Sequence, residues 1–313
     1  MATIHTTVPE GLLPLLESHL PNSLPLLRRL QFTRFPGGQR PSARIIQSSS
    51  GEAFAAAYLD FGSGIETSLF MYSSLERFTS SSSSSSDDHK IAAEGDKAAA
   101  QDRTAAEDHI IAIIDAARLV SKEQPDGRGY PGAVLAGTVA SVVREAMIAR
   151  GVEVRQRQDY EYEKWLFRID EVPDFAGGVV LPEGATWERA DERDCEVVIS
   201  RTHIPRQVKT LMSLPSLVLK LEDGTPIAWS FLGTDGSLSS LHCEEPYRKR
   251  GYAKALAAQL FKRSTGEYGS DGWASADVAP DNLGSRGMCK SLGGRHAWNV
   301  SWNIIQLDEE VKN

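Results

Sequence analysis

A short basic loop in the last third of the chain has the features of a diphosphate-binding site. The segment 241–253 reads Leu-His-Cys-Glu-Glu-Pro-Tyr-Arg-Lys-Arg-Gly-Tyr-Ala and combines a strand end, a basic loop and the start of a helix. Successive backbone N–H groups of such a loop, and the unpaired N–H groups that open a helix, can hold phosphate oxygens. Gly251 lets the backbone approach a ligand closely, and Ala253 keeps the first helical turn slim. The spacing Arg248-x-x-Gly251-x-Ala253 therefore indicates binding of a cofactor that carries a diphosphate.

A second stretch further along the chain strengthens this interpretation. A predicted strand ends at Val278 and is followed by Asn282, by Ser285, and by a predicted helix that closes at Gly293-Gly294. Taken alone, the basic loop could be a solvated loop before an ordinary helix. The second stretch lies in the same half of the chain, and we consider the two stretches together.

The composition limits the classes of protein to which the chain can belong. Its 313 residues carry a net charge of −8, which argues against a nucleic-acid binder because such proteins need a basic face. Cys195, Cys243 and Cys289 form neither a metal-binding spacing nor a disulfide framework, which favours a reducing compartment and no metal. The start of the chain lacks the features of a signal peptide, and no apolar run approaches the ~20 residues of a membrane span. We therefore predict a cytoplasmic protein with no membrane partner.

The first half of the chain is predicted to mix helices and strands. Leucines at helical spacing over 10–30 predict two short helices, and the runs over 44–46, 53–59 and 67–72 predict strands. The serine- and alanine-rich stretch about 79–101 can bury no core, so we predict a disordered insertion there. Further elements are predicted as a helix over 105–121, a strand over 131–139, a helix over 140–150 and a strand over 160–169.

The second half is predicted to be a compact α/β unit. A linker over 173–182, which contains Gly177-Gly178, places a domain boundary near residue 180. The periodicity then predicts a mainly helical segment over 197–212 that is broken by Pro205. It also predicts strands over 217–221, 227–232 and 236–243, a helix over 252–262, a strand over 273–278, a helix over 282–292 and a strand over 298–307. Hairpin strands followed by alternating helices and strands indicate an α/β (α+β) fold with a mixed central sheet flanked by helices.

Taken together, the two motifs resemble those of the GNAT superfamily of acyltransferases, in which Arg/Gln-x-x-Gly-x-Gly/Ala precedes a second motif of this kind. A closer resemblance is to the glycine N-acyltransferase-like family with its FR47-like C-terminal domain. It rests on Gly-Thr-Pro-x-x-Trp-Ser at 224–230, Trp-Asn-x-x-Trp-Asn at 298–303 and Leu-Pro-x-Ser-Leu at 20–24. The similarity is strong over about 215–307 and looser before residue 180.

The resemblance implies a GNAT fold, preceded by a degenerate GNAT-like N-terminal half. The implied domains are a GNAT-like domain over 1–179 and a catalytic N-acyltransferase domain over 180–313. The implied co-substrate is acetyl-CoA or another acyl-CoA, whose pantetheine arm lies between the strands that carry the two motifs. The cofactor-binding residues that the resemblance implies are Cys243, Arg248, Lys249, Arg250, Gly251, Tyr252, Ala253, Lys254, Asn282 and Ser285.

The catalytic residues expected from the family are replaced in this sequence. The family has a glutamate base directly after a glycine, where this chain has Gly236-Ser237. Many GNAT enzymes have a tyrosine acid where this chain has Cys289. His242 and Glu244 are the nearest replacements for the base, because imidazole and carboxylate groups can both accept a proton. A surface position for His242, a solvated loop position for Glu244 and a structural role for Cys289 stay open as alternatives.

The predicted function is acyl transfer from acyl-CoA to the amine of a small molecule or an amino acid. Positioning of the amine, proton transfer, and a backbone N–H near Cys243 or Glu244 that polarises the thioester carbonyl would supply the catalysis. Two alternatives use the same cofactor loop: a GNAT-fold module that binds CoA without catalysis, and a protein or peptide N-acetyltransferase. The sequence leaves the acyl chain, the acceptor and the oligomeric state open.

Overall fold

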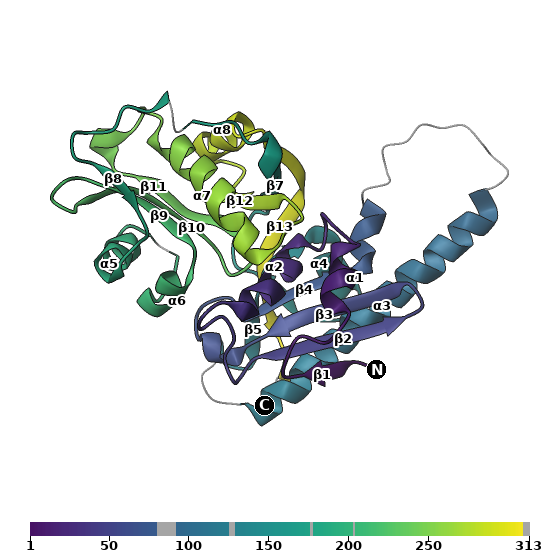
Figure 1. The fold of residues 1–313 in the computed structure, drawn as a ribbon. Coiled ribbons are helices and arrows are strands. Elements are labelled where there is room, and N and C mark those ends of the chain that lie inside the picture. Colours follow the sequence, from purple (N-terminus) through teal and green to yellow (C-terminus); the bar gives the residue numbers. More distant parts are fainter. Residues whose placement is uncertain (80–91, 125–128, 176–177, 203, 309–313) are drawn as a thin grey trace. The chain divides into compact units, whose positions relative to one another are not determined.

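The computed structural model describes residues 1–79, 92–124, 129–175, 178–202 and 204–308 of the chain (Figure 1). The chain divides into two compact units. Unit 1 consists of residues 1–30, 40–159 and 300–313, and unit 2 consists of residues 31–39 and 160–299. The assignment of functional domains to 1–179 and 180–313 stays a prediction.

Unit 1 is built on a mixed sheet. Its strands are β1 (Thr3–His5), β2 (Arg44–Ser50), β3 (Ala53–Leu59), β4 (Leu69–Ser73), β5 (Ala133–Ala140) and β6 (Val154–Gln156). They lie in the order β1-β2-β3-β4-β5, followed by residues 300–306 of β13 (Arg295–Gln306), with which β6 also pairs. Its helices are α1 (Leu12–Glu17), α2 (Leu24–Gln31), α3 (Ala92–Glu123) and α4 (Ser141–Ala149), with short 3₁₀ turns at η2 (Phe61–Ser63) and η3 (Ser74–Thr79).

Unit 2 is built on further strands of mixed direction. Its strands are β7 (Tyr162–Arg168), β8 (Thr186–Glu188), β9 (Ser216–Lys220), β10 (Pro226–Leu232), β11 (Ser237–Cys243) and β12 (Trp273–Val278). They lie in the order β8-β9-β10-β11-β12-β7. Its helices are α5 (Glu192–Ser200), α6 (Val208–Ser213), α7 (Tyr252–Tyr268) and α8 (Leu283–Ser291), with 3₁₀ turns at η1 (Phe32–Arg34), η4 (Ile169–Glu171) and η6 (Glu245–Tyr247).

The two units repeat one strand pattern. In unit 1 the antiparallel strands β2, β3 and β4 are followed by the parallel pair β4 and β5. In unit 2 the antiparallel strands β9, β10 and β11 are followed by the parallel pair β11 and β12. The next antiparallel neighbour of β5 is β13, which comes from the C-terminal end of the chain, and that of β12 is β7, which precedes the other strands of unit 2 in the chain. In both units this position is therefore filled by a segment distant in sequence.

One prediction of secondary structure is corrected here. The insertion predicted about 79–101 lies outside the described residues over 80–91, but from Ala92 the backbone is helical as the start of α3. Alanine has the highest helix propensity, so this alanine-rich stretch can extend a helix without a core of its own. The break predicted at Pro205 is confirmed, because the helical region there is two helices, α5 and α6, and the segment between them contains this proline, which lacks a backbone N–H.

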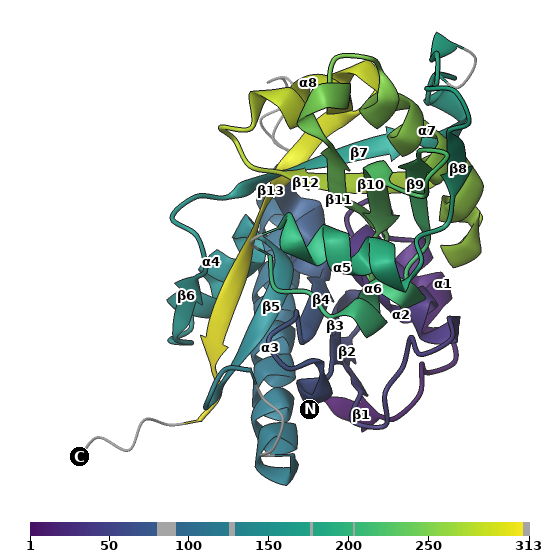
Figure 2. The ribbon, with the colours of Figure 1, turned by 90° about the vertical axis from the view of Figure 1, so that its left-hand side faces the viewer.

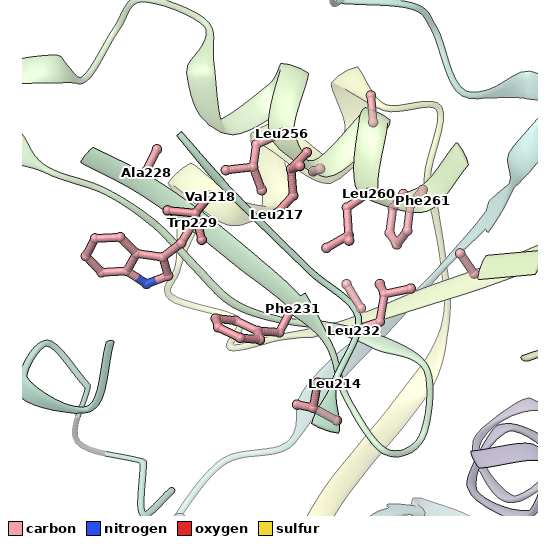
Figure 3. Close-up of a cluster of buried hydrophobic side chains, with 14 of the residues drawn as sticks. Leu214, Leu217, Val218, Ala228, Trp229, Phe231, Leu232, Leu256, Leu260 and Phe261 are labelled. Atoms are coloured by element: carbon pink, nitrogen blue, oxygen red, sulfur yellow. The ribbon is translucent and has the colours of Figure 1, made fainter. Parts of the chain in front are cut away.

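The sheet of unit 2 is covered on both faces. Helices α5 and α6 lie on one face and α7 and α8 on the other (Figures 1 and 2). Leu256, Leu260 and Phe261 of α7 are fully buried over the central strands (Figure 3). Side chains alternate between the faces of a strand, and Trp229 and Phe231 of β10 point away from α7 (Figure 3). The two faces of β10 and β11 are therefore distinct environments.

No helix in the described ranges combines the length and the apolar character needed to cross a lipid bilayer.

A buried lysine ties β9 to the start of α5 in unit 2. Lys220 Nζ lies 2.8 Å from Asp191 Oδ2 and 2.8 Å from Asp194 Oδ2. Asp194 is 3% exposed, so its carboxylate depends on this cation. Lys220→Met is expected to lower the free energy of unfolding by about 3 kcal/mol at neutral pH, because it leaves a buried carboxylate unpaired. Chemical denaturation measures this, and Lys209→Met, at an exposed lysine of α6, is the control.

The same contact sets the sign of the pH dependence. The hydrogen bond from Lys220 holds the pKa of Asp191 below its ordinary value. The contribution of the ionised Asp191 to folding stability is therefore fully present above the unfolded-state pKa of about 3.9. This contribution is lost as the pH falls from that value through the lower pKa of the folded state. The difference between wild type and Lys220→Met should shrink at about pH 3. An unchanged difference at that pH would contradict this account.

Candidate functional site

The basic loop leaves a row of backbone N–H groups without partners. Gly251 has a φ of 87° and precedes α7, and no side chain caps this helix. The first N–H of α7 with an acceptor is that of Ala255, which donates to Gly251 O at 3.0 Å. Within the described part of the chain, the N–H groups of residues 249–254 have no hydrogen-bond acceptor. Because residues 248–251 are exposed, an anion can reach these donors.

The side chains of the loop shape it as well as charge it. Arg248 Nε donates to Cys243 O at 3.0 Å, and Arg250 Nη2 donates to Pro246 O at 3.2 Å. Both arginines remain exposed, as do Lys249 and Lys254. These four residues add positive charge around the unpaired N–H groups of a chain whose net charge is −8.

The structure explains why glycine occupies position 251 and tyrosine occupies position 252. The φ of Gly251 lies in the left-handed region, and a Cβ there would lie 3.4 Å from Val179 Cγ2. The Tyr252 side chain is 2% exposed, and its hydroxyl donates to Val180 O at 3.0 Å. The tyrosine side chain at this position is therefore part of the core and not of the loop surface.

The two motif strands part shortly after they meet. β11 and β12 are paired at Ser237 with Ser275 and at Leu238 with Ala276. Beyond these pairs, β11 continues beside β10 as far as Cys243, whereas β12 continues beside β7 as far as Val278. Each strand thus keeps one neighbour, and the two edges that face each other are left open to an extended ligand.

A β-bulge turns His242 to the face of α5 and α6. Ser240 has a φ of 55°, and the register with β10 shifts between the pairs Phe231–Ser239 and Trp229–His242. Trp229 and Phe231 share one face because they are two residues apart, so Ser239 and His242 share it too. Without the extra residue, His242 would point towards α7.

His242 is held in a fixed orientation beside an acidic group. Its ring stacks on Trp229 with centroids 4.5 Å apart and planes at 19°. His242 Nε2 lies 3.6 Å from Glu244 Oε2, and it is buried with no hydrogen-bond partner in the described residues. Glu244 Oε1 accepts a hydrogen bond from Arg201 Nε at 3.0 Å. An imidazole placed in this way can take a proton, and the carboxylate can stabilise the resulting cation.

The backbone of β11 offers a donor at the opening. The N–H of Glu244 is committed, since it donates to Ile227 O of β10 at 2.9 Å. Backbone groups alternate in direction along a strand, so the N–H and C=O of Cys243 point to the open edge. The contact of Arg248 with Cys243 O agrees with this direction. Of the two N–H groups proposed to polarise a carbonyl, that of Cys243 has the suitable direction.

Cys289 lies in the hydrophobic core and not at the opening. It belongs to α8, is 0% exposed and is part of the core cluster of unit 2. Burial, reinforced by the negative charges of Glu163 and Asp277, raises the pKa of its thiol to about 12. The structural role considered for this cysteine fits these surroundings, and a role as acid does not.

Asn282 and Ser285 form the N-terminal cap of α8. Asn282 Oδ1 accepts a hydrogen bond from the Ser285 N–H at 3.0 Å. Asn282 is exposed and Ser285 is half-buried, so the cap lies at the protein surface. It stands at the start of α8, just beyond the end of β12. Their contact with a cofactor stays a prediction.

The sequence did not point to several residues that the fold brings to the site. Arg201 reaches Glu244 from the end of α5, and Arg206 Nη2 donates to Ser239 Oγ at 3.2 Å. Lys164 of β7 forms an ion pair with Asp277 of β12, with Nζ 2.7 Å from Oδ1. These residues lie outside the two motifs, and their partners are distant in sequence, so no local pattern reveals them.

No group of three or more His, Cys, Asp and Glu side chains within the described ranges has an arrangement that could hold a metal ion.

Comparisons with solved structures identify the fold. A Drosophila protein determined by X-ray crystallography is 15% identical, with a TM-score of 0.61, and 96% of each chain is covered. A tandem GNAT protein from the clavulanic acid biosynthesis pathway is 12% identical, with a TM-score of 0.53, covering 99% of this chain and 100% of that one. These similarities show a GNAT fold with a two-part architecture, as predicted. A search of curated proteins finds no match.

Two family models match the sequence. The FR47-like protein family matches residues 217–303. The acyl-CoA N-acyltransferase verG N-terminal domain matches residues 1–165, which is more than half of the chain. Residues 160–165, at the end of this match, lie in unit 2. The chain belongs to the acyl-CoA N-acyltransferase family that this N-terminal domain defines.

Proposed function

We propose that this protein is an acyl-CoA-dependent N-acyltransferase that moves an acetyl or other acyl group to the amine of a small molecule or an amino acid. The observation that carries the proposal is the row of unpaired N–H groups at residues 249–254, which follows an exposed basic loop beside the parting of β11 and β12. A helix N-terminus of this kind favours a diphosphate, and the open strand edges favour an extended amide-bearing arm.

The residues of β11 fit the requirements of acyl transfer. The thioester, when bound, supplies the activated acyl carbon that the amine attacks. The Cys243 N–H stabilises the negative charge that develops on the carbonyl oxygen. His242 takes the proton that the amine loses as the new C–N bond forms, and Glu244 stabilises the imidazolium. The C–S bond then breaks, and the thiolate that leaves takes up a proton from water or from His242.

A second candidate function, a CoA-binding module without catalysis, draws support from two residues. Ser237 stands where the glycine N-acyltransferase-like family has its glutamate base, and Cys289 is too deeply buried to act as the acid. The third candidate, a protein or peptide N-acetyltransferase, has the same cofactor loop and differs in the acceptor. A screen of acyl-CoAs against pooled amines and peptides, read by release of free thiol, separates the three candidates.

The cofactor loop is tested by titrating CoA and acetyl-CoA in a calorimeter. Arg250→Glu combined with Gly251→Asp is expected to weaken binding by about tenfold or more, because both changes put negative charge at a helix N-terminus. Arg263→Glu combined with Gly266→Asp makes the same two changes at exposed positions near the other end of α7 and should bind like wild type. Absence of CoA binding by the wild type would end the proposal.

The proposed base is tested by His242→Gln, which keeps the size and polarity of the side chain. The variant should lose about 100-fold or more in kcat/KM, the usual contribution of a general base, and should keep the CoA affinity of the wild type. His296→Gln, at an exposed histidine of unit 2, is the matched control. Full activity of His242→Gln would exclude this residue as the base.

A further inference from the structure

The end of β12 depends on β7 at the point where the cofactor opening begins. β12 pairs with β11 up to Ala276, and the next residue, Asp277, has β7 as its neighbour. The register of β12 with β7 continues through Asp277–Lys164 and Val278–Glu163. From Asp277 onwards, one strand sets the position of this wall of the opening.

A buried ion pair lies at this junction. Lys164 Nζ is 2.7 Å from Asp277 Oδ1 and 2.9 Å from Oδ2. The Lys164 side chain is 0% exposed and that of Asp277 is 6% exposed. Because charges taken out of water are costly, such a pair is weak evidence for stability and is better explained by the geometry that it imposes.

The ion pair lies on the same face of the sheet as the proposed base. Ser237 and Ser275 are partners in parallel strands and share a face, and Asp277 lies two residues beyond Ser275 on that face. The bulge at Ser240 keeps Ser239 and His242 on the same face as Ser237. The opening is therefore flanked on one face by His242 from β11 and by the Lys164–Asp277 pair from β12 and β7.

We infer that Lys164 is a positioning residue for the acyl-CoA site, an inference that rests on the proposed function. By holding Asp277, it keeps the end of β12 with β7 and away from β11, and so sets the width of the opening. Lys164 lies within the N-terminal family match, 1–165, and outside the FR47-like match, 217–303. The N-terminal region thus supplies a side chain on which the cofactor site of unit 2 depends.

The test replaces the pair without leaving a buried charge. Lys164→Met combined with Asp277→Leu exchanges the ion pair for apolar side chains of similar volume, a change that folded proteins commonly tolerate. The fold should therefore remain. Because apolar contacts impose no fixed geometry, the end of β12 should shift, and kcat/KM for acyl-CoA should fall about 100-fold, the loss expected when a reacting centre is displaced. The acceptor KM should change little, and hydrogen exchange should rise at residues 277–285 more than in β9 and β10.

A matched control lies on the same strand and face. Arg168→Gln removes a cation that pairs with Asp170 at the opposite end of β7, beside the start of β12. It should leave the KM for acyl-CoA and the exchange of 277–285 unchanged. Asp277→Asn, which keeps the shape of the side chain, should reproduce the acyl-CoA defect if it folds, as judged by circular dichroism and melting temperature.

The outcomes separate this inference from the proposed function. If the wild type binds no CoA, the proposed function fails and the inference fails with it. If the wild type binds CoA and the apolar pair keeps the wild-type kcat/KM for acyl-CoA, the positioning role is overturned while the proposed function stands. A lowered melting temperature with unchanged acyl-CoA kinetics would also overturn it, because the pair would then be only structural.

Discussion

The short contact between β11 and β12 is the constraint on which the rest of the site depends. Two residue pairs join these parallel strands, and beyond them each strand is held by its outer neighbour. Unpaired strand edges in a sheet expose backbone donors and acceptors that another extended chain can satisfy. The opening is therefore a consequence of pairing geometry, and it exists only because β10 and β7 hold the two strands from outside.

The electrostatics of the site are local. The chain carries a net charge of −8, yet the entry to α7 combines four cationic side chains with the unpaired N–H groups of residues 249–254. Backbone donors and a helix N-terminus attract an anion at short range without any overall positive charge. An acidic protein can bind a polyanionic co-substrate in this way, provided that no side chain occupies the donors.

The β11 side of the opening is organised by a single inserted residue. The bulge at Ser240 reverses the direction of the side chains that follow it, which brings His242 onto Trp229 and Glu244 towards Arg201. The same bulge leaves Cys243 with its backbone N–H on the open edge. One irregularity in β11 thus aligns the proposed base and a main-chain donor along the same short segment.

Local pattern was enough to predict the loop at 248–253, the strands and helices around it, and an α/β fold with a mixed sheet, whereas the GNAT fold was implied by the resemblance of the two motifs to a known family. Glycine at a left-handed position, a basic loop and alternating apolar residues can each be recognised from a few neighbouring residues. The start of α3 at Ala92 escaped prediction because a low-complexity stretch that is rich in alanine suits both a helix and a loop. The face of His242, the burial of Cys289, the strand partners of β7 and β13 and the pair Lys164–Asp277 were decided only by the tertiary structure. Each depends on register or packing between segments far apart in the chain. Such contacts produce no local sequence pattern from which they could be predicted.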